Sequence, residues 1–240
     1  MQRCLPSWHG PSARELLHGR GYAVLSHVAT ANQCKQALAS LHEAAWDTNG
    51  LPSHALADGT TVHDSRRQQT SASRAGWISV LTALLAQGLD REELLECTTG
   101  KKQVVRLHGL KSLRLDEYVP SDDPHVLQEG DQGAHTDESR ERYDEWMHMH
   151  PAPSDAPLSV ILAIMPGTRL RIFADNAWHI LKLELGDAVV FRGNVLHNGV
   201  GYAEEHLRVH AFVYPPGYDH ISEVDFEDGG PMAEEGVVEI

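Results

Sequence analysis

The stretch ILKLELGDAVVFRGNVLHNGVGYAEEHLRVHAFVY, residues 180–214, carries most of the fold information in this chain. It consists of short runs of β-branched and alternating apolar residues, separated by Gly, Asn and Asp. Such runs are typical of short antiparallel strands. Gly186-Asp187 has the composition of a tight turn between two of these strands.

The same pattern extends upstream to residue 102. We interpret the following runs as strands: Gln103–Leu107, Leu113–Tyr118, Leu158–Ile164, Leu170–Phe173, His179–Leu183, Ala188–Phe191 and Leu207–Tyr214. Short strands in succession, punctuated by turn residues, indicate an antiparallel sandwich or a jelly roll, and of the two we expect the jelly roll, that is, a cupin-like double-stranded β-helix. The fold class is therefore mainly β, with flanking N-terminal helices.

The N-terminal part has mainly the helical period. The segments that we expect to be helical are Pro11–His18, a helix that starts at Thr30 or Asn32, Trp77–Leu85 ending at Gly88, and Asp90–Leu95. Tyr22–Leu25 has the character of a short strand. Asn49–Gln69 is polar and rich in turn residues, so we predict a long loop there.

Length and composition fit one domain. The chain has 240 residues, of which 41% are apolar and 22% charged, which is ordinary for a globular protein. We expect a single domain over 1–240, with a helical support region at 1–101, a jelly-roll core at 102–215 and an acidic tail at 216–240. The tail is predicted to be loosely held, because residues 215–240 contain eight acidic and no basic side chains.

Several features bear on the compartment. No apolar run approaches the roughly 18–20 residues that span a bilayer, and residues 1–6 contain no apolar signal segment. The three cysteines, Cys4, Cys34 and Cys97, are odd in number and far apart, which argues against a disulfide framework. These features predict an intracellular protein without membrane contact, in the cytoplasm, with the nucleus as an alternative.

The charge is unevenly distributed. Residues 1–115 hold 13 basic and 9 acidic groups, and residues 116–240 hold 7 basic and 25 acidic groups, for a total of −14. An acidic chain is repelled by phosphate backbones, which disfavours nucleic-acid partners. One local basic patch remains an alternative, and its members would be Arg66, Arg67, Lys101, Lys102, Arg106, Lys111 and Arg114.

The candidate chemistry begins at His135-Thr136-Asp137. A His-x-Asp triplet alone means little, since 16 His and 16 Asp in 240 residues produce about one by chance. It gains weight from His197, which opens a later strand, and from Arg208 eleven residues further on. Two imidazoles and one carboxylate occupy one face of an octahedral metal and suit non-haem Fe(II). An arginine beside them offers a planar, two-pronged donor for a carboxylate.

On these residues the chain resembles the Fe(II)/2-oxoglutarate-dependent dioxygenase superfamily over about residues 103–214. The opening Gly21-Tyr22-Ala23-Val24-Leu25 is similar to prolyl-hydroxylase-like and phytanoyl-CoA-hydroxylase-like members. The resemblance implies that His135, Asp137 and His197 are the catalytic metal ligands. It also implies Fe(II), 2-oxoglutarate and O₂ as cofactor and co-substrates, with ascorbate as a candidate reductant.

The co-substrate site has further candidates. Arg208 would bind the distal carboxylate of 2-oxoglutarate, and Tyr118 would supply a hydroxyl to it. His210 stands where several families have Ser. It shares a strand face with Arg208 and either approaches the co-substrate pocket or is a hydrogen-bonded core histidine.

Residues 138–157 lie between Asp137 and the next strand, and we expect them to form a substrate lid, with a surface decoration as the alternative. Tyr143 and Trp146 are the candidate substrate contacts, and Met147–His150 is predicted to be a loop. The expected reaction is hydroxylation of a C–H bond with release of succinate and CO₂. The substrate classes, in order of preference, are a peptide or protein residue, a small molecule and a nucleobase. A non-catalytic metal-binding jelly-roll protein is the alternative from another class.

Overall fold

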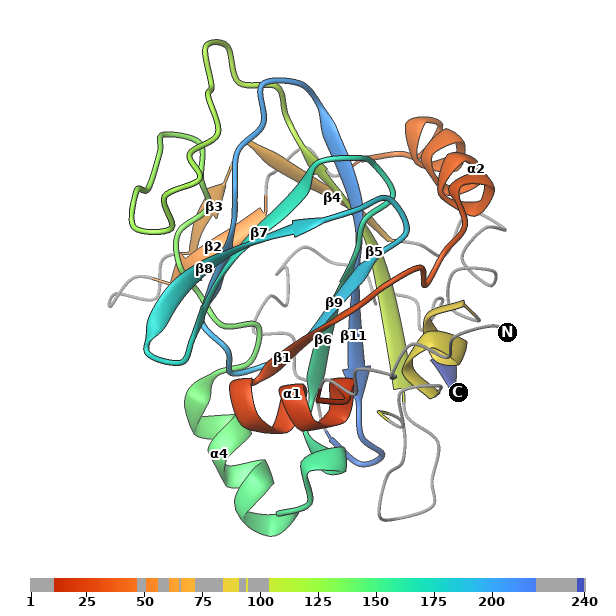
Figure 1. Ribbon diagram of the computed structural model, residues 1–240, viewed down its shortest axis with the longest axis vertical. Coiled ribbons are helices and arrows are strands. Elements are labelled where there is room, and N and C mark those ends of the chain that lie inside the picture. Colours follow the sequence, from red (N-terminus) through yellow and green to blue (C-terminus); the bar gives the residue numbers. More distant parts are fainter. Residues whose placement is uncertain are drawn as a thin grey trace, which may run out of the picture.

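The structure, a computed structural model, describes residues 11–46, 51–55, 61–64, 66–71, 84–90, 94, 104–218 and 237–239. Two antiparallel sheets dominate it (Figure 1). In the larger sheet the strands run in the order β1-β9-β6-β11-β5-β12, and β4 also pairs with β5. The smaller sheet has the order β10-β7-β8, and β2 and β3 form a separate ribbon.

The larger sheet joins strands that are distant in sequence. Its members are β1 (Tyr22–Leu25), β4 (Arg67–Ser71), β5 (Val104–Ser112), β6 (Leu158–Leu162), β9 (Ala188–Arg192), β11 (His206–Tyr214) and β12 (Val237–Glu239). Strand β11 lies at its centre and is antiparallel to β5 on one side and to β6 on the other. Between β6 and β11 the chain passes back and forth between the two sheets, because β7, β8 and β10 belong to the smaller one, which is the topology of a jelly roll.

The smaller sheet contains β7 (Thr168–Ala174), β8 (Ala177–Leu183) and β10 (His197–Gly199). Strands β7 and β8 form a hairpin, visible across the front of Figure 1. Asp175 and Asn176 make its two-residue turn with φ of +50° and +59°. Both values lie in the left-handed region that the favoured hairpin turns require, and Asp and Asn tolerate it well.

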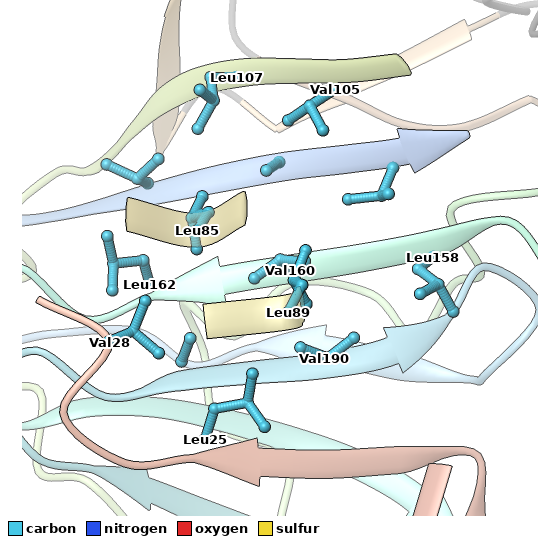
Figure 2. Close-up of a cluster of buried hydrophobic side chains, with 14 of the residues drawn as sticks. Leu25, Val28, Leu85, Leu89, Val105, Leu107, Leu158, Val160, Leu162 and Val190 are labelled. Carbon is cyan, nitrogen blue, oxygen red and sulfur yellow. The ribbon is translucent and has the colours of Figure 1, made fainter. Parts of the chain in front are cut away.

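Two apolar clusters lie on opposite faces of the larger sheet. On strand β6, Val160 and Leu162 belong to the cluster on the helical side, where Leu85 and Leu89 of the helical segment 84–90 also pack (Figure 2). Ile161, between them, belongs to the cluster that fills the space between the two sheets. Side chains of a strand alternate between its faces, so a strand covered on both sides reads as a continuous apolar run.

The N-terminal elements follow their local signals. Helix α1 (Ala13–Arg20) begins at Ser12, whose side chain accepts from the Glu15 amide, and ends at Gly21 in the left-handed conformation. Helix α2 (Ala31–His42) has the same capping box, formed by Thr30 and Gln33. These two helices and strand β1 confirm the sequence prediction. Among the described residues, no helix is long and apolar enough to span a membrane.

Four predictions about local structure are wrong. The polar segment 49–69 contains β2 (Leu51–Ala55), β3 (Thr61–Asp64) and the first residues of β4. The helix predicted to end at Gly88 continues to residue 90. Residues 113–118 form no strand. The amide of Leu113 donates to the carbonyl of Arg66 and that of Leu115 to the carbonyl of Tyr202, and neither acceptor lies in a strand. The acidic tail also ends in a strand, β12, which pairs with β5.

Other predictions lie outside the described residues. Most of Trp77–Leu85, most of Asp90–Leu95 and residues 219–236 of the tail belong to this group. The division of the chain into one domain with three regions stays a prediction.

Candidate metal and co-substrate site

The residues of the predicted metal site come together at the edge of the smaller sheet. His197 is the first residue of β10, and His135 lies opposite it in an isolated bridge. Each residue donates its backbone amide to the carbonyl of the other at 2.9 Å. Asp137, two residues after His135, points to the same side because side chains two apart in extended chain share a face.

Three possible ligand atoms, one each from His135, Asp137 and His197, lie within 4.8 Å of one another. Oδ1 of Asp137 is 3.8 Å from Nε2 of His135 and 3.6 Å from Nε2 of His197. The His197 and Asp137 side chains are only 3% and 7% exposed, whereas the His135 side chain is 21% exposed. The group is thus buried on two sides and reached by solvent from the side of His135.

Backbone carbonyls orient both imidazoles. Nδ1 of His135 lies 2.9 Å from the carbonyl of Gly133, and Nδ1 of His197 lies 3.0 Å from that of Val195. A carbonyl only accepts, so each Nδ1 carries the hydrogen and each Nε2 keeps a lone pair. This is how metal-binding histidines are usually fixed in orientation and tautomer.

The electrostatics of the site also suit a cation. Burial by itself raises the pKa of Asp137, but the imidazoles of His197, His210 and His135 together lower it well below its usual range. Burial lowers the pKa of His197 to about 4, although Asp137 acts in the opposite direction. At neutral pH the carboxylate is therefore charged and this imidazole is neutral, which is the state that binds metal.

Arg208 lies on β11, facing the space between the two sheets. Its neighbours Leu207 and Val209 belong to the cluster on the helical side, so Arg208 points the other way. Arg208 is 4% exposed, and its Nε and Nη1 have no hydrogen-bond partner among the residues that the structure describes. A Cβ atom on Gly199 would lie 2.7 Å from Nη2 of Arg208, so only glycine leaves room for the guanidinium there.

Gln132 contacts His135 of the metal group and also Gly199, which the Arg208 guanidinium approaches as well, and no sequence pattern pointed to it. Its Nε2 lies 3.4 Å from Nε2 of His135, and its Oε1 accepts from the Gly199 amide at 3.4 Å. Gln132 is 8% exposed. A ligand that reaches from Arg208 to the metal group would pass this amide.

Tyr118 occupies a different environment from the one we expected. It follows a turn rather than lying on a strand, and its hydroxyl donates to Oδ1 of Asp131 at 2.8 Å. Burial, together with the Asp131 carboxylate, raises the pKa of Tyr118 above its usual range. Asp131 also accepts from the amides of Gly201 and Gln128 and lies 3.4 Å from Arg171. This polar cluster fastens the loop that leads to His135.

The proposed basic patch is divided by the fold. Arg67 is 2% exposed, and its Nη2 donates to the carbonyls of Gly130, Gly199 and Val200, so it braces the loops around the site. The ammonium of Lys111 lies over the Trp46 ring and 3.6 Å from Glu205. Arg66 and Arg114 are paired with acidic side chains. Lys101, Lys102 and the Arg106 side chain lie outside the described residues.

The segment after Asp137 is a helix rather than a loop. Helix α4 (Arg140–Met149) begins at Ser139, and a short 3₁₀ helix, η2 (Pro153–Asp155), follows it. The loop prediction for Met147–His150 is wrong, because three of those residues are helical and His150 ends the helix. The helix is explained by Ser139, which caps its N-terminus, and by its apolar residues Tyr143 and Met147, which pack on one side against the core.

Both predicted substrate contacts are on α4. Tyr143 is 4% exposed and packs in the cluster on the helical side of the larger sheet, so the segment is not too polar to join a core. Nε1 of Trp146 donates to the carbonyl of Asp155 at 2.7 Å. Its indole stacks on His150 and meets the edge of the Tyr218 ring. Their role as substrate contacts, and that of the segment as a lid, stay predictions.

A row of rings leads from the metal group toward α4. The ring of His210 is 4.4 Å from that of Phe212, and Phe212 and Tyr214 stack at 6.0 Å. Tyr214 stacks in turn on Tyr218 at 5.6 Å, and Tyr218 contacts Trp146. Arg208 precedes this row on the same strand face, so the charged and the aromatic ends of the site lie on opposite sides of His210. The alternation of β11 predicted Phe212 on this face, but no signal pointed to Tyr218.

No family model matches the chain, and no curated protein matches it either. Solved structures do match its fold. The alpha-ketoglutarate-dependent epimerase SnoN from nogalamycin biosynthesis matches with a TM-score of 0.57 and 13% identity, over 94% of this chain and 91% of that one. A prolyl hydroxylase from Trichoplax adhaerens, in complex with a hypoxia-inducible-factor peptide, matches with a TM-score of 0.57 and 10% identity, over 88% and 91%. HygX from Streptomyces hygroscopicus, with nickel and 2-oxoglutarate bound, gives 0.53 and 9%, over 87% and 88%.

These similarities confirm the double-stranded β-helix and the resemblance to 2-oxoglutarate-dependent oxygenases at the level of the fold. At 9–13% identity they show nothing about the substrate of this chain. An epimerase and a prolyl hydroxylase share the same fold among these matches. The reaction of this chain therefore has to be argued from its own site.

Proposed function

We propose that this chain is an Fe(II)- and 2-oxoglutarate-dependent dioxygenase that hydroxylates a C–H bond. One observation carries the proposal: the His-Asp-His group lies on the same side of the sheet as a buried arginine whose Nε and Nη1 have no hydrogen-bond partner among the described residues. A metal alone would account for the first feature and an anion alone for the second. A dicarboxylate that also binds the metal accounts for both.

The donor set fits Fe(II). Two neutral imidazoles and one carboxylate leave three positions of an octahedral ion open. His135, Asp137 and His197 would hold the ion, and the carbonyls of Gly133 and Val195 keep both rings in the orientation that presents Nε2. A structural zinc site would instead close the coordination with a fourth protein ligand.

The surroundings of Arg208 fit the distal carboxylate of 2-oxoglutarate. A guanidinium that is 4% exposed, with Nε and Nη1 unpartnered, costs several kcal/mol unless a negative ligand joins it. A carboxylate can accept two parallel hydrogen bonds from this fork. Gln132, between Arg208 and His135, would line the path of the ligand and offer its amide hydrogens. Tyr118, held by Asp131, would support this end of the site.

With both groups bound, iron and 2-oxoglutarate supply the oxidation of an unactivated C–H bond by O₂, giving succinate and CO₂ besides the product. The protein supplies position and exclusion of water. Solvent reaches the His-Asp-His group from the side of His135, and a substrate would approach a bound ion from there. Trp146 on α4 is proposed to flank that approach, and α4 is proposed to act as the cover. Tyr143, buried in the cluster on the helical side, would anchor this helix rather than contact the substrate.

The substrate is proposed to be a peptide or protein residue, with a small molecule as the second class. The pairing of Lys111, Arg66 and Arg114 with acidic groups weakens the case for a nucleobase substrate. The row of rings beyond His210 offers apolar faces on which a side chain or ring can pack.

Succinate release tests the proposal. The protein with Fe(II), 2-oxoglutarate, O₂ and ascorbate would be incubated with peptide, metabolite and nucleoside pools. We expect one pool to raise succinate above the background of the protein alone and the Asp137→Ala variant to abolish this increase. Equal succinate from wild type and Asp137→Ala in every pool would contradict the proposed activity.

A further inference from the structure

His210 stands next to the metal group, on the inner face of β11. Its Nε2 is 3.3 Å from Oδ2 of Asp137, and the residue is 9% exposed. Neither of these two atoms has a hydrogen-bond partner elsewhere in the structure. The contact is longer than a well-aligned hydrogen bond, but neither atom has another hydrogen-bond partner among the described residues, and such contacts tighten once a site is filled.

The two oxygens of Asp137 face different neighbours. Oδ1 lies 3.8 Å and 3.6 Å from the Nε2 atoms of His135 and His197, which are the proposed ligands. Oδ2 lies 3.3 Å from His210. One oxygen therefore points to the metal position, and the other points away from it toward an imidazole.

His210 does not complete the ligand set itself. The ligand atoms that lie within 4.8 Å of one another come from His135, Asp137 and His197, and His210 is not among them. It is on the Oδ2 side of the carboxylate, behind the ligand rather than beside the metal. A fourth protein ligand would also take one of the three positions that 2-oxoglutarate and O₂ need.

The sheet holds the His210 ring in place. His210 is opposite His108 of β5 and Ile161 of β6 in the strand register, so backbone pairing fixes it on both sides. The Phe212 ring covers it at 4.4 Å with the planes inclined by 46°. A side chain confined in this way can fix the orientation of another group through a single hydrogen bond.

We propose that His210 is a positioning residue that donates its Nε2 hydrogen to Oδ2 of Asp137 and so presents Oδ1 alone to the metal. This inference rests on the proposed function. It assigns His210 to the carboxylate ligand and not to 2-oxoglutarate. One-oxygen binding by Asp137 keeps three metal positions open, whereas binding through both oxygens would leave two.

Mn(II) affinity without 2-oxoglutarate tests this assignment independently of activity. It can be measured from the signal of free Mn(II) in electron paramagnetic resonance. His210→Leu keeps the bulk but removes the donor, and we expect it to weaken Mn(II) binding by about 10–100-fold. His210→Gln keeps an N–H donor on a side chain of similar reach, and we expect Mn(II) binding within about threefold of wild type.

His108→Gln is the matched control, because His108 faces the same space from the opposite strand and contacts Phe212 rather than Asp137. Circular dichroism and the midpoint of thermal unfolding verify that each variant is folded. Wild-type affinity in folded His210→Leu would overturn the inference, and so would a loss in His210→Gln equal to that in His210→Leu, which would indicate a fourth ligand. Equal Mn(II) binding by wild type and Asp137→Ala would contradict the proposed function itself, whatever the role of His210.

Discussion

The two faces of strand β11 are built from opposite kinds of residue, although both are buried. The face toward the helices carries apolar side chains that are at most 1% exposed, namely Leu207, Val209, Ala211 and Val213. The face toward the smaller sheet carries Arg208, His210, Phe212 and Tyr214. Buried charge and imidazole contribute less to stability than apolar packing does. One face of the strand therefore stabilises the fold, and the other carries the chemistry.

The largest effect is expected at the metal group. Asp137→Ala removes the only carboxylate of the ligand set, and we expect at least a 100-fold loss of Mn(II) or Fe(II) affinity, about the upper limit for residues that only support a ligand. Asp187→Asn is the control, because Asp187 accepts backbone amides of His27 and Glu184 in a turn. It should lose about 1 kcal/mol of stability and no metal affinity. Equal metal affinities in Asp137→Ala and Asp187→Asn would contradict the assignment of Asp137 as a metal ligand.

The second effect concerns Arg208, on the face of β11 toward the smaller sheet, where we expect a change in binding without a loss of stability. Arg208→Ala should weaken 2-oxoglutarate binding by about 2–5 kcal/mol, because it leaves the ligand carboxylate unpaired. Its unfolding midpoint without 2-oxoglutarate should be no lower than that of wild type, since Nε and Nη1 of Arg208 have no hydrogen-bond partner in the described part of the chain. Arg208→Lys should recover part of the affinity. Calorimetry of binding and of unfolding measures both. A destabilised Arg208→Ala with unchanged affinity would make Arg208 a structural residue.

The neighbouring residue should behave in the opposite way. Leu207 is 0% exposed and packs against the helical side, so Leu207→Ala should destabilise the protein by about 2–5 kcal/mol. The metal affinity of the folded fraction should stay that of wild type. Urea unfolding gives the first quantity and Mn(II) titration the second. A large loss of metal affinity in this variant would show that the two faces are not independent.

The smallest effect concerns pH. Burial, with a contribution from Arg208, lowers the pKa of His206 from 6.5 to about 3. Between pH 3 and pH 6.5 the His206 imidazole is therefore protonated in the unfolded chain and neutral in the folded chain. Its contribution to the free energy of unfolding is complete above pH 6.5 and decreases as the pH falls toward 3. We expect a loss of about 1 kcal/mol per pH unit at most. His206→Gln should flatten this slope in urea unfolding, and a slope equal to that of wild type would contradict the assignment.

The sequence predicted those parts of the molecule where local signals and tertiary structure agree. The helix predicted to start at Thr30 or Asn32 is capped by Thr30, and the apolar runs of β6, β9 and β11 became strands. The sequence also grouped His135, Asp137 and His197, because the order of a His-x-Asp, a turn, a lone His and an Arg on the last strand is informative as a set.

The sequence failed where tertiary contacts decide. Leu113–Tyr118 has the alternating pattern of a strand, but the hydrogen bond from the Tyr118 hydroxyl to Asp131 holds Tyr118 in a loop. We expected Arg67 in a surface patch, because its three carbonyl partners lie 63–133 residues away and the sequence does not show that they meet it. Gln132 and Tyr218 could not be found in advance, since a lone Gln or Tyr in a loop carries no periodic signal.

The central claim is that one site binds Fe(II) and 2-oxoglutarate together, through the triad and Arg208. Anaerobic titration of the Fe(II)-loaded protein with 2-oxoglutarate, followed by visible absorption, tests it most directly. We expect a weak charge-transfer band that saturates in wild type, that is absent in Asp137→Ala, and that needs at least about thirtyfold more 2-oxoglutarate in Arg208→Ala, the lower end of the loss of about 2–5 kcal/mol above. A wild-type protein without the band, or an Arg208→Ala titration that overlays that of wild type, would contradict the account.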